Sequence, residues 1–162
     1  MTILGTDYFS GDPKVDDLYR SIKDPLQGMV SEWTPEIIGE TTAGTATYTS
    51  QYGVCLSYGQ VIDVWFSVEW SAHAGSAGNL NLSLPCSVYP LPSVFPFKGS
   101  LQISLFDLTA GYTYALISPV PDTEFARVVE CSPDKTKTAT NVAICPAGSL
   151  KGHVRFLRKY DG

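Results

Sequence analysis

The stretch that decides the fold is Val61-Ile62-Asp63-Val64-Trp65-Phe66-Ser67-Val68-Glu69-Trp70. Its side chains alternate between apolar and polar, which is the period of a β-strand with one face in the core and one largely polar face. The core face of the strand carries Ile62, Val64, Phe66, Val68 and Trp70. Val61 and Trp65 break the pattern because they fall on the polar face. An outward tryptophan indicates a subunit interface, with an isolated exposed side chain and a sugar site as the alternatives.

The same alternation recurs on both sides of this stretch. Further strands are predicted at Ala46–Ser50, Val54–Tyr58, Asn79–Leu84, Leu101–Asp107, Tyr112–Ser118, Phe125–Cys131, Asn141–Cys145 and His153–Tyr160. The proline-rich run Pro85–Pro96 cannot be a central strand, because proline lacks the ladder donor. It is predicted to be a crossover loop that Phe95 and Phe97 hold to the core edge, with a ligand-gripping loop as the alternative. Short strands at this spacing predict an all-β sandwich or barrel.

Residues 1–32 differ from the rest and are interpreted as an N-terminal docking arm ahead of a head domain over 33–162. Asp12-Pro13 can open a short helix, and Asp24-Pro25 ends it. One face of this helix is apolar and carries Val15, Leu18, Tyr19 and Ile22. A helix of about ten residues is not stable alone in water. It therefore packs either on its own domain or on a neighbouring protein.

The net charge is −5, and no Lys or Arg occurs from Asp24 to Phe97. The basic residues gather instead on the last predicted strand, at Lys151, Arg155, Arg158 and Lys159. We interpret them as charges that guard a solvated or edge strand. Nucleic acid is not an expected partner, because its binding needs clustered cations. No apolar run is long enough to insert into a membrane, and residues 1–30 do not resemble a secretory signal.

Catalytic and metal-binding patterns are not found, so we expect no enzyme activity, metal or cofactor. The four cysteines have no zinc-type spacing and are expected to be reduced thiols. The two histidines have no nucleophile elbow beside them. His73 falls in the glycine-rich loop 71–79, as a loop residue that faces a three-fold axis or a ligand. Asp63 and Glu69 share a strand face, but about 20 Å of strand separates them, which is too far for a catalytic pair.

Several short motifs together resemble a recurrent bacteriophage β-domain. They are Trp33-Thr34-Pro35, Thr42-Ala43-Gly44-Thr45-Ala46-Thr47-Tyr48-Thr49, Gln51, Gly53, Gly59, the loop 71–79 and Leu84-Pro85. The resemblance spans about residues 33–160 and is strongest over 33–85. It implies a jelly-roll-like antiparallel β-sandwich that forms homotrimers on the virion, after synthesis in the host cytoplasm. Most such domains lie at the ends of tail fibres or tailspikes, and similar sandwiches serve as capsid cement or decoration proteins.

The chain departs from the fibre members because it has a 32-residue arm in place of a long stalk. The sequence therefore favours a non-enzymatic, trimeric capsid cement protein whose arm docks on the major capsid proteins. The alternative is a short tail-fibre tip that recognises a host surface glycan or an outer-membrane component. The loops 71–79 and 85–97 would then carry recognition.

Overall fold

Strands make up the regular structure of the chain. A computed structural model describes residues 29–90, 99–104, 108–132 and 138–159, and this part contains no helix. The strands are β1 (Met29–Trp33), β2 (Ile37–Gly39), β3 (Thr45–Tyr58), β4 (Val61–Ala74), β5 (Leu80–Ser83), β6 (Gly99–Ser104), β7 (Tyr114–Pro119), β8 (Phe125–Cys131), β9 (Thr140–Asn141) and β10 (Gly148–Leu157).

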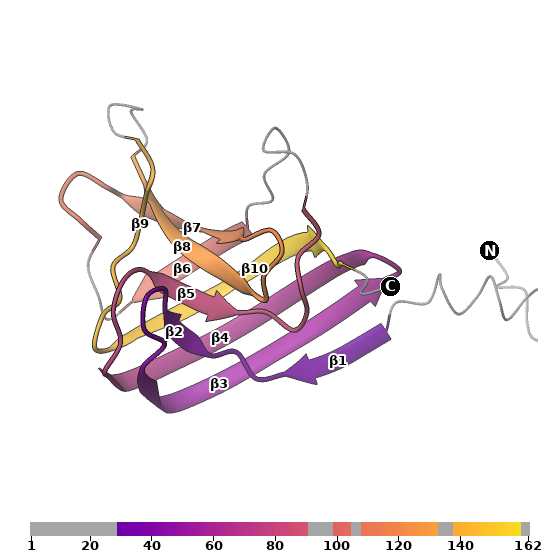
Figure 1. Cartoon of the computed structure of the whole chain (residues 1–162), viewed down its shortest axis with the longest axis horizontal. Coiled ribbons are helices and arrows are strands. Elements are labelled where there is room, and N and C mark those ends of the chain that lie inside the picture. The colour runs from indigo at the N-terminus through magenta and orange to yellow at the C-terminus, as the bar shows by residue number, and fades with distance from the viewer. Residues whose placement is uncertain (1–28, 91–98, 105–107, 133–137, 160–162) are drawn as a thin grey trace, which may run out of the picture.

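All ten strands belong to one antiparallel sheet, in the order β1-β3-β4-β10-β6-β7-β8-β5-β2, with β9 paired to β8. The sheet curls into a half-barrel, so that β3, β4 and β10 form one wall and β5, β7 and β8 lie across from them (Figure 1). The curl brings β2 back to β3, where Ile37 donates its backbone N–H to the Tyr48 hydroxyl at 2.7 Å.

The core fills the inside of this curl. The core face predicted for Val61–Trp70 is confirmed, because its five apolar side chains are all buried. Across from them, Leu80, Leu82, Ile117 and Val128 have no exposed surface. Burial of each such side chain contributes about 1.5–3 kcal/mol to the free energy of unfolding. The alternation of the sequence thus becomes the inner and outer faces of the curled sheet.

Residues of the motifs between Trp33 and Gly53 pack against one another. The indole of Trp33 lies directly over Gly53, where an added Cβ would sit 2.5 Å from Trp33 Nε1. Nearby, Gln51 donates its side-chain amide to the Pro35 carbonyl at 2.9 Å. These contacts fasten β1 and the segment after it onto β3, with which β1 pairs along its whole length.

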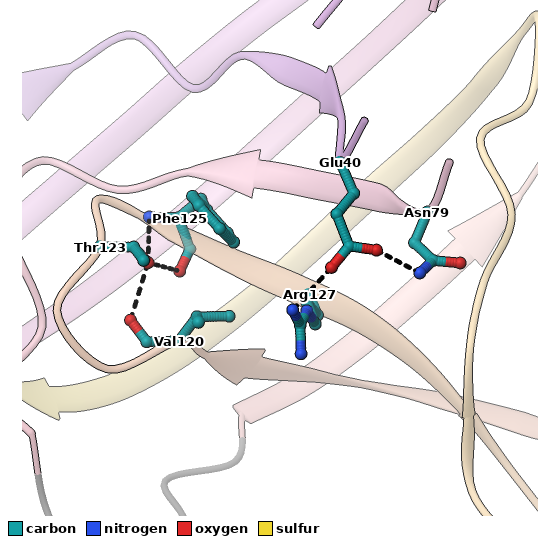
Figure 2. Close-up of polar contacts among 6 residues, drawn as sticks. All are labelled: Glu40, Asn79, Val120, Thr123, Phe125 and Arg127. Carbon is teal, nitrogen blue, oxygen red and sulfur yellow. Dashed lines mark hydrogen bonds and ion pairs between the residues drawn. The ribbon is translucent and has the colours of Figure 1, made fainter. Parts of the chain in front are cut away.

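Two groups of polar contacts involve β5, β8 and the segments beside them (Figure 2). The Glu40 carboxylate accepts from Arg127 Nη2 at 2.6 Å and from the Asn79 side-chain amide, which links the segment after β2 to β5 and β8. In the turn between β7 and β8, Thr123 Oγ1 donates to the Val120 carbonyl at 2.7 Å. The loop 71–79 is likewise held, by backbone hydrogen bonds between Thr42 and Ala77.

The all-β, antiparallel part of the predicted fold is confirmed, whereas a jelly-roll arrangement is not specifically shown by this strand order. The two strands predicted over 46–58 are one strand, β3, which contains irregularities of register near Tyr48. The sequence did not predict β1 or β2, and β1 contains Met29–Glu32 of the predicted arm. The helix expected over 12–24, with Val15, Leu18, Tyr19 and Ile22, lies outside the described residues, as do Phe95 and Phe97.

Candidate binding surface

The outward side chains of β1, β3, β4 and β10 form one surface, which we call the outer face. Residues that lie opposite each other in an antiparallel pair point to the same side of the sheet. Trp65 of β4 lies opposite Val54 of β3 and His153 of β10, so these three share the outer face. Several large apolar side chains are exposed on it: Val30 (70%), Tyr52 (56%), Tyr58 (45%) and Trp65 (44%).

The outer face divides into two parts with different chemistry. On the β1 and β3 side lies an apolar band made of Val30, Val54, Leu56, Tyr58 and Val61. On the β10 side lies a set of basic and aromatic residues that we call the platform: Trp65, Lys151, His153 and Arg155. The first part suits contact with another apolar surface, and the second suits a polar or anionic ligand.

The platform is held rigid by a buried carboxylate. Asp63 is only 3% exposed, although it belongs to the predicted polar face. Its two oxygens accept from Arg155 Nε at 2.9 Å and from Arg155 Nη2 at 2.7 Å. His153 Nε2 lies 3.0 Å from Asp63 Oδ1, and the His153 ring stacks on Trp65 with 4.8 Å between centroids. One carboxylate therefore orients the cation directly and the indole through the imidazole.

The charges of this cluster support each other. The hydrogen bond from the Arg155 side chain lowers the pKa of the Asp63 carboxyl, although burial opposes this shift. In return, the hydrogen bond and the charge of Asp63 raise the pKa of the Arg155 guanidinium. Both groups are therefore ionised at neutral pH, and the pair is a fixed element of the outer face.

Of the interpretation of the basic residues as charges on a solvated or edge strand, the edge part is wrong for Lys151 and His153, whereas Lys151 and Arg155 are exposed as a solvated strand face predicts. β10 lies between β4 and β6: it pairs with β4 along its whole length and with β6 over Ser149–His153, so Lys151 and His153 have a paired neighbour on both sides. Lys151, His153 and Arg155 recur at every second residue of β10 and thus project from the middle of the sheet. Lys159 lies beyond the end of β10, where it forms an ion pair with Asp122.

The structure places the other predicted site residues apart from one another. Val61 is partly buried at the end of the apolar band. His73 lies on β4 rather than in a loop, because this strand runs to Ala74, and neither of its ring nitrogens has a hydrogen-bond partner among the described residues. Asp63, which the sequence analysis considered with Glu69 as a catalytic pair and rejected, contacts the side chains of Arg155 and His153.

The four cysteine thiols form no disulfide, and three of them have a raised pKa. All four cysteines are free. Burial raises the pKa of Cys86 and of Cys145 to about 11, and it also raises the pKa of Cys55. These three thiols are therefore protonated and weakly nucleophilic at neutral pH. No group of three potential metal ligands gathers among the described residues.

Sequence reasoning missed the role of Asp63, His153 and Arg155 as one cluster. The signal that could have indicated it is the two-residue spacing of Lys151, His153 and Arg155, which places three basic side chains on one face of a strand. Their pairing with Asp63 could not be seen, because about ninety residues separate the partners along the chain.

Comparisons with known proteins complete the description. No protein-family model matches the chain, and no curated protein matches it significantly. Among solved structures, the chain is similar to the crystal structure of the Dettilon tailspike protein (gp208), with a TM-score of 0.49 and 19% sequence identity. The match covers 78% of this chain but only 23% of the tailspike chain.

No helix in the described residues is long and apolar enough to span a membrane.

Proposed function

We propose that this chain is a non-enzymatic binding module of a bacteriophage tail that contacts the host surface. The observation that carries the proposal is the outer face, where large aromatic and aliphatic side chains stand exposed beside a rigid charged cluster. Exposed Trp, Tyr and Arg side chains on a rigid scaffold are typical of recognition surfaces. The protonated thiols and the ion-paired Asp63 offer no comparable support for catalysis.

The tail is preferred to the capsid because of the phage domains that residues 33–85 resemble. Most of these domains lie at the ends of fibres or spikes. The proposal includes that this chain shares their jelly-roll fold. The capsid cement hypothesis depended on the arm, and residues 1–28 lie outside the described structure. In this proposal the partners are other tail proteins and a host glycan or outer-membrane component, and the chain is located in the virion.

The proposal includes self-association into a homo-oligomer, with a trimer as the expected form. The apolar band, including Val61, supports a contact with another copy, since burying Val30 and Tyr58 removes exposed apolar surface from water. Trp65 was predicted at this contact, but it lies at the border between the band and the platform, stacked on His153.

The location is tested by immunogold electron microscopy of virions that carry the chain, together with a count of copies per particle. Label on the tail, with a few to a few tens of copies, supports the proposal. Label over the whole shell with hundreds of copies would instead show a decoration protein and refute the tail assignment. Sedimentation of the purified chain tests the oligomer, and a monomer at all concentrations contradicts that part.

A further inference from the structure

We infer that the platform (Trp65, Lys151, His153 and Arg155) is a binding site for an anionic oligosaccharide, in particular one that contains hexuronic acid. This inference rests on the proposed function and deepens it, because it names the class of host ligand and the residues that hold it. Three independent features of the platform carry it: the position of its cations, the donors that remain free, and the indole surface.

The first feature is the position of the cations in the sheet. Charged side chains commonly protect the edges of sheets, but β10 pairs with β4 along its whole length and with β6 over Ser149–His153. Lys151 lies within the doubly paired part of the strand and therefore does not protect an edge. The protein as a whole is acidic, with a net charge of −5. A basic strip on the interior strand of an acidic protein needs another explanation, and attraction of an anion supplies one.

The second feature is the set of donors that the cluster leaves free. A guanidinium has five N–H groups in a planar fork. Arg155 uses Nε and one N–H of Nη2 on Asp63, and its side chain remains 64% exposed. No described residue takes the remaining N–H groups, so they are available to a ligand. Because Asp63 neutralises Arg155, the uncompensated positive charge of the platform is that of the exposed Lys151.

The third feature is the indole of Trp65, which is 44% exposed. The stacked imidazole of His153 supports the ring, and the polar contact of His153 Nε2 with Asp63 fixes that imidazole in turn. A flat, rigid aromatic surface beside hydrogen-bond donors suits a pyranose ring, which has one apolar face and a rim of hydroxyl groups.

The spacing of the platform matches more than one sugar unit. Lys151 and Arg155 are four residues apart on a strand, which is about 13 Å. Trp65 lies opposite His153, midway between them. A ligand that stacks on the indole can therefore reach Lys151 on one side and the free N–H donors of Arg155 on the other, so a chain with repeated carboxylates fits better than a monosaccharide. Glu69 lies further along β4 and limits the basic surface at that end.

The test is a titration of the purified full chain with α-1,4-trigalacturonate at neutral pH and low salt, followed by calorimetry and by tryptophan fluorescence. The methyl ester of the same trisaccharide is the matched neutral ligand. We expect the acid to bind and to quench fluorescence, and the ester to bind at least about fivefold more weakly. Added salt should weaken binding of the acid, because the contact with Lys151 is exposed and screened.

Two variants and two matched controls locate the site. Trp65→Ala should weaken binding of the acid by about tenfold, while Tyr114→Ala removes an equally exposed aromatic ring from β7 and should have no effect. Lys151→Gln should weaken binding by about threefold to tenfold. Lys159→Gln makes the same change of charge away from the outer face and should change binding by less than about twofold. Circular dichroism confirms that each variant is folded.

Several results would overturn the inference. They are the absence of binding by the acid, equal binding of the ester, an unchanged affinity in Trp65→Ala, or tighter binding of an oligothymidylate of equal charge, which would show a nucleic-acid site. A second copy that covers Trp65 would also overturn it, and would appear as protection of the exposed indole from acrylamide quenching as the chain associates. If the trisaccharide fails but the labelled chain still localises to phage tails, only this inference is lost and the proposed function stands.

Discussion

The contact between Gly53 and Trp33 makes a sharp prediction about how β1 is attached to the sheet. In Gly53→Ala the new Cβ would lie 2.5, 2.7 and 2.8 Å from three atoms of the Trp33 indole. The ring must move, and overpacking of this kind costs about 1–3 kcal/mol. Alanine also restricts the unfolded chain, which offsets about 0.4–1 kcal/mol of that cost. We expect a net loss of about 1–2 kcal/mol in the free energy of unfolding.

The measurement is urea unfolding followed by far-ultraviolet circular dichroism. With a slope of about 1–3 kcal/mol per molar urea, the loss corresponds to a midpoint lowered by about 0.3–2 M. Trp33→Ala provides the control, because it removes the ring that Cβ would strike. In that background Gly53→Ala should be neutral or slightly stabilising. An equal loss in both backgrounds would refute the packing argument and would place the cost of the substitution elsewhere.

Other predictions concern the cluster, the core and the thiols. The pKa of Asp63 is lowered in the folded state, so its stabilising effect is complete above the unfolded pKa of about 3.9 and is lost as pH falls through the lower folded pKa. In thermal unfolding, the advantage of the wild type over Asp63→Asn should therefore shrink in acid. A difference that stays constant with pH would contradict this. Trp70 is buried and Trp65 is exposed, so Trp70→Ala should destabilise the fold by about 3–5 kcal/mol and Trp65→Ala should change stability by less than about 1 kcal/mol. If chemical denaturation ranks the two variants the other way, Trp65 and not Trp70 is the tryptophan that β4 turns toward the core. Cys86 and Cys145 are partly buried and their pKa values are raised to about 11, so both should react slowly with a thiol reagent at pH 8 and rapidly after unfolding. Fast labelling of the native chain would contradict this.

Local pattern was enough to predict the class of fold and the inward face of the main strand. The five apolar residues from Ile62 to Trp70 are buried as expected, and Phe125–Cys131 is a strand with the predicted bounds. Both results follow from alternation within a short window, which does not depend on distant contacts. The short strands β1 and β2 gave no such signal. β1 carries little alternation, and it is a strand because it pairs with β3.

The candidate site was only partly accessible to the same reasoning. Trp65 stood out because a large apolar residue broke the alternation, and it is exposed as that break indicates. Its neighbours did not stand out. His153 looked like an isolated histidine, and Asp63 looked like an ordinary solvent-facing carboxylate, whereas it is nearly completely buried.

The amino-acid sequence by itself therefore determined an all-β chain, the inner face of Val61–Trp70 and one outward tryptophan. Only the tertiary structure decided that the last strand lies in the middle of the sheet, and that its basic side chains surround this tryptophan. The reason is that strand order depends on pairing between segments far apart in the chain. A period of two tells which side of a strand a residue faces, but it does not tell which strand lies beside it.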